Sequence, residues 1–222
     1  MTRLLEAVLV GAAGSALGAL TFGLFELAVV GGVIGGLNGV ISGALGIYDW
    51  RSIRGVFSMA IDSTWGLPLI GGSLLLHAAN LITGKANYRA DLSARAGYHV
   101  YGAGIYARKG FVWTVGNVMS NARPHDVRRL QMLQRHEGLH VWQHRAFGPL
   151  YPLLYLSWMV AGGIAGTGIW LRRRGSWGKT VETIAYYDNP FETAAYKRDE
   201  RWPHPAADRS LSWGGGGRQT RD

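Results

Sequence analysis

Five residues at positions 136–140, with the sequence HEGLH, form a pattern that is typical of a zinc site. On a helix, His136 and His140 project from one face, one turn apart, so both imidazoles can reach one cation. Glu137 lies between them, where its carboxylate can accept a proton from water beside the metal. The pattern also fits ordinary polar positions on a helix. Because catalytic zinc usually takes three protein ligands, a metal site requires a third.

The candidate for the third ligand is Glu192, in the stretch DNPFETAAY at residues 188–196. Asn189 can cap a helix and Pro190 is favoured at its first position, so we expect Glu192 in the first turn with a defined direction. His204, which follows a proline in a loop, is an alternative third ligand. For the other polar residues we expect no metal contact. Gln143 either supports the site or is solvated. His125 and His144 are expected at the surface, His99 in a strand, and His77 in a packed or interfacial position.

The segments HEGLHVWQ and DNPFETAAY resemble the gluzincin branch of the zincin metallopeptidases. They are still more similar to a group of small bacterial membrane-associated proteins in which a Gly-Asn/His-Val motif, here residues 116–118, precedes HExxHxxQ. In that group a linker, here FGPL at residues 147–150, leads to the DNPFE segment. The resemblance covers about residues 95–200. It implies that His136, His140 and Glu192 bind zinc and that Glu137 is the general base.

Two departures from the gluzincin pattern affect the expected site. Gluzincins often have an acidic residue one turn after the third ligand, where it orients a ligand histidine, but that position is Tyr196 here. No tyrosine or histidine has the spacing of the usual oxyanion donor. Tyr186, Tyr187 and Tyr196 are therefore candidates by proximity in sequence.

The elements that must position these residues are short. Residues 97–119 alternate large apolar and small residues, which predicts two strands joined by a turn at residues 108–110. A helix is expected from about residue 126 to residue 144, with the HExxH pattern on it. Residues 205–222 end in a glycine-rich polar stretch that predicts a flexible tail.

The first part of the chain is apolar and rich in glycine. The runs 7–25 and 27–48 carry no charged residue, and each is long enough to cross a hydrocarbon core about 30 Å thick. In the second run a glycine recurs every four residues, at Gly31, Gly35, Gly39 and Gly43. This is the pattern of a glycine zipper in membrane helices. We expect a helical hairpin that reverses at Glu26. A glycine-rich hairpin buried in a soluble oligomer is the alternative. Residues 55–83 form either a third span or a re-entrant or interfacial helix.

Another apolar run, residues 149–171, lies between the two halves of the expected metal site and precedes three arginines at 172–174. A single membrane crossing there would separate His140 from Glu192. Both flanks of the run are basic, and positive flanks tend to stay on the same face of a membrane. We therefore expect residues 149–171 to enter and leave on one face, as a hairpin bent at one of its glycines (Gly162, Gly163 or Gly166). The alternatives are an amphipathic helix pair that lies in the interface and a metal site that itself lies at membrane depth.

Composition narrows the functional classes further. The net charge of +9 is not accompanied by a nucleic-acid motif, so we expect the basic residues to face anionic lipid or the cytoplasm, with no nucleic-acid partner. The chain has no cysteine, which excludes disulfides and thiolate zinc sites.

These patterns predict a mainly α-helical membrane protein of the bacterial cytoplasmic membrane, with its basic domain facing the cytoplasm. A glycine-zipper membrane region (residues 1–84) precedes a small α+β zincin-like domain (85–204) that contains a β-hairpin and the apolar insertion 149–171. The tail (205–222) follows. The expected function is a Zn²⁺-dependent hydrolase, a metallopeptidase acting on a peptide or protein. The alternative is a non-catalytic structural or assembly subunit with a structural or vacant metal site, forming a homo- or hetero-oligomer through the glycine zipper.

Overall fold

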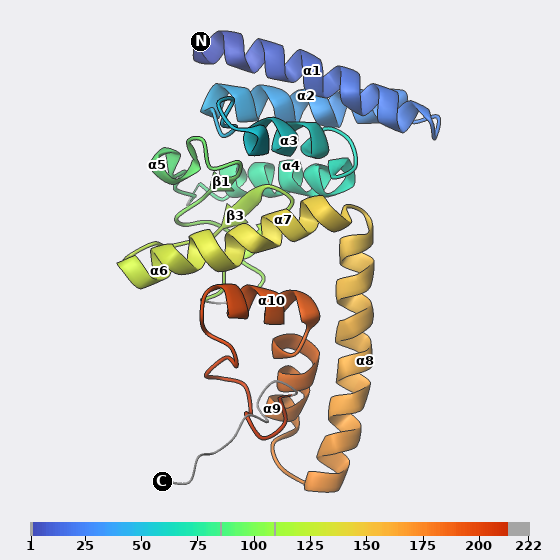
Figure 1. Ribbon diagram of the computed structural model, residues 1–222, viewed down its shortest axis with the longest axis vertical. Coiled ribbons are helices and arrows are strands. Elements are labelled where there is room, and N and C mark those ends of the chain that lie inside the picture. Colours follow the sequence, from blue (N-terminus) through green and yellow to red (C-terminus); the bar gives the residue numbers. More distant parts are fainter. Residues whose placement is uncertain (1, 85, 109, 213–222) are drawn as a thin grey trace. The chain divides into compact units, whose positions relative to one another are not determined.

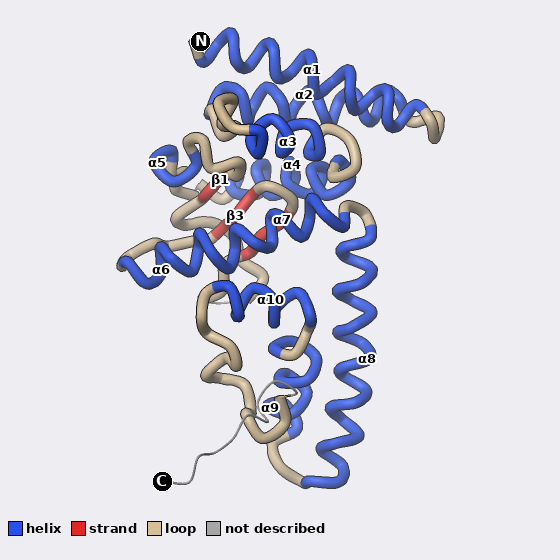
Figure 2. Tube along the Cα trace, in the orientation of Figure 1, coloured by secondary structure: helices blue, strands red, loops and turns tan. Residues whose placement is uncertain are grey.

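The computed structural model describes residues 2–84, 86–108 and 110–212 of the chain. Most of these residues are helical, and three short strands form one small sheet (Figure 2). The chain divides into two compact units. Unit 1 comprises the chain up to Leu133 together with His140–Pro149, and unit 2 comprises Gln134–Leu139 together with the chain from Leu150 onward.

Helices α1 (Arg3–Gly23) and α2 (Ala28–Leu45) form the expected hairpin in unit 1 and pack along each other (Figure 1). The chain reverses at Glu26, which has a positive φ of 62°. Glycine is required where the two backbones are closest, because a Cβ on Gly35 would overlap the carbonyl oxygen of Gly14. The glycine stripe therefore packs against the neighbouring helix of the same chain, as small residues do between membrane helices.

Both helices, and α8 (Leu150–Arg173) in unit 2, are long and apolar enough to cross a membrane. Helices α3 (Ile53–Asp62) and α4 (Leu67–Ile82) are bent against each other by 86°. The region between residues 55 and 83 is therefore a bent pair, which fits a broken span or a re-entrant loop, and His77 on α4 is buried.

The sheet in unit 1 has the strand order β1-β3-β2, with β1 (His99–Val100) parallel to β3 (Val118–Ser120) and β2 (Trp113–Val115) antiparallel to it. A single helical turn, α5 (Ala90–Ser93), precedes β1.

The predicted hairpin of two strands joined by a turn at residues 108–110 is wrong. Phe111 N donates to Arg108 O at 3.0 Å, but β1 and β2 on either side of this turn do not pair with each other, and Lys109 lies outside the described residues. The antiparallel hairpin in the sheet is formed by β2 and β3. The chain reverses between β2 and β3, at Gly116, whose φ of +54° favours glycine. A Cβ at Gly116 would also lie 2.7 Å from the carbonyl oxygen of Leu69, so the turn is pressed against α4. The alternating pattern located β1 and β2, but it did not predict the reversal at Gly116, which depends on close packing against α4.

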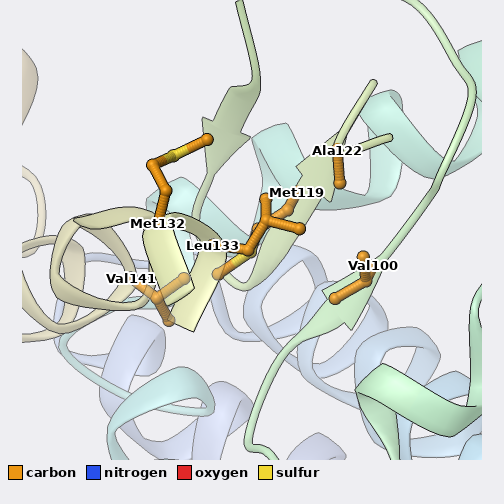
Figure 3. Close-up of a cluster of buried hydrophobic side chains, with 6 residues drawn as sticks. All are labelled: Val100, Met119, Ala122, Met132, Leu133 and Val141. Carbon is orange, nitrogen blue, oxygen red and sulfur yellow. The ribbon is translucent and has the colours of Figure 1, made fainter. Parts of the chain in front are cut away.

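Side chains from the sheet and from the following helix form a buried apolar cluster in unit 1 (Figure 3). The helix has three consecutive segments, α6 (Val127–Met132), η1 (Leu133–Glu137) and α7 (Gly138–Phe147). Each large side chain buried there contributes about 1.5–3 kcal/mol. The cluster thus fixes the helix that carries the HExxH pattern. Its members are Val100, Met119, Ala122, Met132, Leu133 and Val141.

The interior of unit 1 also contains a buried ion pair. Arg145 donates hydrogen bonds to both carboxylate oxygens of Asp62 at 2.8 Å, and each side chain is no more than 3% exposed. Tyr48 donates to the same carboxylate at 2.9 Å. Breaking such a pair by removing one partner costs about 3–5 kcal/mol, because a charge is left buried. This pair ties α7 to α3.

Unit 2 is built on α8, which is followed by α9 (Trp177–Glu182), η2 (Thr183–Tyr187) and α10 (Pro190–Arg198). The segments α9 and η2 run back along α8 and are named here the return arm (Figure 1).

The expected bend within residues 149–171 is wrong, because α8 is one continuous helix. The chain reverses after it, at Arg174, which has a φ of +58°. The glycines that suggested a bend instead allow the return arm to pack closely against α8, because a Cβ on Gly162 would lie 2.7 Å from Ala185 Cα. The reversal expected within the run is achieved by the return arm, so Glu192 comes back toward the start of α8.

Part of the expected tail packs against unit 2. The backbone N–H of Asp208 donates to Thr183 Oγ1 at 3.0 Å, and Ser212 donates to Asp188 Oδ1 at 2.7 Å. Ala207 and Ser212 are buried. Residues 213–222, the rest of that expected tail, lie outside the described residues.

Candidate metal centre

The helix that carries the HExxH pattern is continuous from Val127 to Phe147, slightly longer than expected. Asp126 begins it by accepting a hydrogen bond from Arg129 N at 2.6 Å. The segment η1 within it is a π-helical turn, and it contains His136 and Glu137. Such turns are rare and occur often at functional sites. Nothing in the sequence pattern predicts it.

His136, His140 and Glu192 come together as the sequence predicts, in a group that could hold a metal ion. One ligand atom from each residue lies within 4.8 Å of the other two, and all three residues are buried. His136 Nε2 lies 3.5 Å from Glu192 Oε2, which identifies the atoms that face each other. Two imidazoles and one carboxylate are the donor set of several catalytic zinc sites.

Two contacts in unit 2 set the direction of the Glu192 side chain: the cap of the helix that carries it and a hydrogen bond to its carboxylate. Asn189 caps α10 by accepting from Phe191 N at 3.0 Å, with Pro190 at the first helical position, as expected. Tyr155, on α8, donates a hydrogen bond to Glu192 Oε1 at 2.9 Å. With Oε1 held by the phenol, Oε2 is directed to His136.

Each of the two histidine rings has a side-chain oxygen near its Nδ1. His140 Nδ1 lies within hydrogen-bond distance of Gln143 Oε1, at 2.8 Å, and a partner there leaves Nε2 for a cation. His136 Nδ1 lies 3.6 Å from Asp199 Oδ2, an ion-pair distance and not a hydrogen bond. Gln143 is buried beside its histidine, so of the two expectations for it the solvated position is wrong, and support of the site stays a prediction.

Asp199 supplies the carboxylate that sequence reasoning missed. It ends α10, two helical turns after Glu192, whereas the gluzincin pattern has its acidic residue one turn after the third ligand, where Tyr196 stands here. Its side chain is 2% exposed. Burial raises the pKa of Asp199, and the nearby charge of His136 opposes that shift. The spacing of seven residues on one helix is the signal that would have found it.

The three candidate tyrosines lie in different surroundings. Burial and the charge of Glu192 raise the pKa of both Tyr186 and Tyr196. The Tyr196 ring lies 4.5 Å from that of His136, whereas Tyr187 stacks on His204 at 4.6 Å. Tyr155 was missed because it belongs to an apolar run that the sequence describes as membrane-inserted.

The remaining histidines are not part of the metal group among the described residues. His204 Nδ1 accepts from Ala206 N at 3.2 Å, and burial, followed by Arg201 and His136, lowers the pKa of His204 to about 4. His99 lies in β1 and His125 is exposed, as expected.

The expectation that His144 lies at the surface is wrong. The residue is buried, with Nδ1 3.2 Å from the carbonyl oxygen of Gly116. Burial lowers the pKa of His144 to about 3. Because residue 144 lies one turn after His140, the helix keeps both rings on its buried side.

Glu137 lies on the π turn directly after His136 and is 7% exposed. Its negative charge contributes to raising the pKa of Asp199 and of Tyr186, so its carboxylate is electrostatically close to both. The three possible metal ligands therefore have two further buried carboxylates near them, those of Asp199 and Glu137.

Comparisons of the chain with protein-family models, with curated proteins and with solved structures found no match.

Proposed function

We propose that the protein is a membrane-associated, zinc-dependent hydrolase that acts on peptide bonds. His136, His140 and Glu192 are its metal ligands and Glu137 is its general base. The observation that carries the proposal is the convergence of these two helical histidines with a carboxylate from α10.

The donor set fits a divalent cation of the zinc type. Two Nε2 atoms and one carboxylate oxygen are offered, and the Nδ1 atoms of both rings already face acceptors, Gln143 and Asp199. Three protein ligands leave a coordination position for water or substrate, which distinguishes catalytic from closed structural zinc sites. The absence of thiols excludes the cysteine-rich structural sites.

A bound Zn²⁺ supplies a Lewis acid that polarises a carbonyl and brings the pKa of water toward about 7. The chain supplies the rest of the chemistry. Glu137 accepts the proton of the attacking water and passes it to the leaving amine. Tyr186 or Tyr196, both kept protonated by burial, donates a hydrogen bond to the oxygen that becomes negative.

The test is the variant Glu137→Gln in detergent-purified protein, with wild type and His140→Ala beside it. Each protein is analysed for bound metal and incubated with a mixture of synthetic peptides whose products are read by mass spectrometry. We expect Glu137→Gln to keep its metal and lose at least about 100-fold in hydrolysis, since general base catalysis contributes that much or more. Hydrolysis retained by Glu137→Gln would contradict the assignment of the base.

A structural metal site is the second candidate, and the burial of the group favours it. His136, His140, Glu192 and Glu137 are each less than one-tenth exposed. In that case wild type binds metal, cleaves none of the peptides, and loses stability when the metal is removed by a chelator. The same preparation therefore separates the two candidates.

A further inference from the structure

Helix α8 exposes one uncharged stripe along its whole length. The exposed residues repeat at helical spacing from Leu150 to Leu171, over 22 positions and about 32 Å of helix. The opposite face packs against the return arm, where Gly162 and Gly166 admit its backbone. We name the exposed set the α8 stripe: Leu150, Leu153, Leu154, Leu156, Ser157, Val160, Ala161, Ile164, Ala165, Gly168 and Leu171.

The far end of the stripe is basic and aromatic. Exposed Arg172 and Arg173 end α8, exposed Arg174 follows them, and exposed Lys179 lies on α9. Trp177 at the start of α9 is 53% exposed. Tryptophan prefers the membrane–water interface, and clustered Arg and Lys attract anionic headgroups.

The other face of the hairpin is too polar to cross a bilayer. Its return arm carries Lys179 and Glu182, and Asp208 is attached to that arm by its bond to Thr183. The pKa of Asp208 is lowered, first by its hydrogen bond from Ser210 and to a smaller extent by the charges of Lys179 and Arg173. A transmembrane α8 would carry these ionised groups into hydrocarbon, which is unfavourable.

We propose that α8 lies in the plane of the membrane, with the α8 stripe against the acyl chains and its basic end on anionic headgroups, and that the α8–return arm hairpin does not cross the bilayer. An apolar face about 32 Å long with charges on the opposite side is the form of an interfacial helix. Tyr155, on the inner face, then holds Glu192 about one helix diameter, roughly 10 Å, from the lipid.

The absence of cysteine makes a sidedness test direct, because each introduced thiol is unique. Gly175→Cys marks the tip of the hairpin, where a Cβ has open space, and Ala194→Cys marks an exposed position on α10. Both variants are treated with a membrane-impermeant maleimide in uniformly oriented membrane vesicles from the expressing cells. The proposal requires both thiols to react from the same side. Reaction from opposite sides would establish a crossing and overturn it.

Depth is measured with a nitroxide on Val160→Cys, in the middle of the α8 stripe, in proteoliposomes. We expect collisions with oxygen to dominate over collisions with a water-soluble nickel chelate. A label reached mainly by the nickel chelate would place the stripe in water, and a label shielded from both would place a protein partner on it. Either result would overturn the proposal.

The headgroup contact is tested by lipid composition and by charge. In phosphatidylcholine vesicles that contain phosphatidylglycerol, the nitroxide should lie deeper than in phosphatidylcholine alone. Changing Arg172, Arg173 and Arg174 together to Gln should remove that difference, whereas Arg198→Gln on α10 should keep it. A depth independent of phosphatidylglycerol would contradict the contact with anionic headgroups.

Discussion

The side chains around the metal group carry out separate tasks. Gln143 and Asp199 face the Nδ1 atoms of the two histidines, and Tyr155 holds one oxygen of Glu192. Partners of this kind are worth about 10–100-fold in metal affinity or activity in characterised metal sites. The candidate site therefore depends on residues that the HExxH pattern alone does not include.

Asp199→Asn tests the support of His136. The neutral amide cannot hold the Nδ1 proton as strongly as a carboxylate, so zinc affinity should fall by about 10–100-fold. Affinity is measured by competition with a chromophoric chelator. Glu200→Gln is the matched control, because that neighbouring carboxylate is 79% exposed in its pair with Arg135. Equal affinities in the two variants would show that Asp199 does not support the ligand.

Tyr155→Phe removes one hydroxyl and leaves the ring. The Glu192 carboxylate then loses its hydrogen bond, and both zinc affinity and the absorption spectrum of the cobalt-substituted protein should change. Trp170→Phe is the control on the same helix, because Trp170 donates to Gly175 O at the far end of the hairpin. An unchanged cobalt spectrum in Tyr155→Phe would remove Tyr155 from the site.

Buried His144 predicts acid sensitivity. Its folded pKa of about 3 lies below the ordinary value of 6.5, so the unfolded chain binds the proton more tightly. The stability is fully present above pH 6.5 and is lost as the pH falls from 6.5 toward 3. At pH 5 the loss is on the order of 2 kcal/mol.

The measurement is the free energy of unfolding of wild type and His144→Gln between pH 7 and pH 5. We expect a smaller loss in the variant, since glutamine does not titrate, whereas exposed His125→Gln should behave as wild type. Identical pH dependence in His144→Gln and wild type would contradict the burial of a neutral imidazole.

At the scale of elements, the return arm decides whether Glu192 reaches the histidines. Its close approach to α8 depends on Gly162, where a Cβ would lie 2.7 Å from Ala185 Cα and 3.0 Å from Ile184 O. Gly163, the next residue, has open space around its Cβ position. The two glycines form a natural pair of test and control.

Gly162→Ala should therefore lower stability and zinc affinity together, because the arm that leads to α10 is displaced. Gly163→Ala should stabilise the helix by about 0.5–1 kcal/mol, the usual preference for alanine over glycine in helices. Denaturant unfolding and chelator competition measure both effects. Similar behaviour of the two variants would contradict the packing of the return arm on α8.

The elements show what the sequence could predict. Local signals located the α1–α2 hairpin, the helix with His136 and His140, and the Asn189 cap, because each depends on near neighbours in the chain. The return arm could not be predicted, because its partner is α8, and an apolar run with glycines fits a bend as well as a packing surface. The π turn depends on tertiary packing and left no local signal, whereas Asp199 left one, its position seven residues after Glu192 on the same helix.

At the scale of the whole molecule, the chain joins apolar helices to a polar metal group. Three helices, α1, α2 and α8, are long and apolar enough to cross a membrane. The return arm removes the conflict in which a single crossing at residues 149–171 would separate His140 from Glu192, and the proposed in-plane position of α8 keeps the whole hairpin on one face. A hydrolase with that arrangement would act on polypeptides at the membrane surface.

Metal analysis of the whole protein tests the central claim most directly. Wild type and Glu192→Ala, purified in detergent, are dialysed against a trace of zinc and their bound zinc is measured by elemental analysis. The account predicts one zinc ion per wild-type chain and little or none in Glu192→Ala, because the third ligand is lost. Equal zinc in both proteins, or none in wild type, would contradict the three-residue centre.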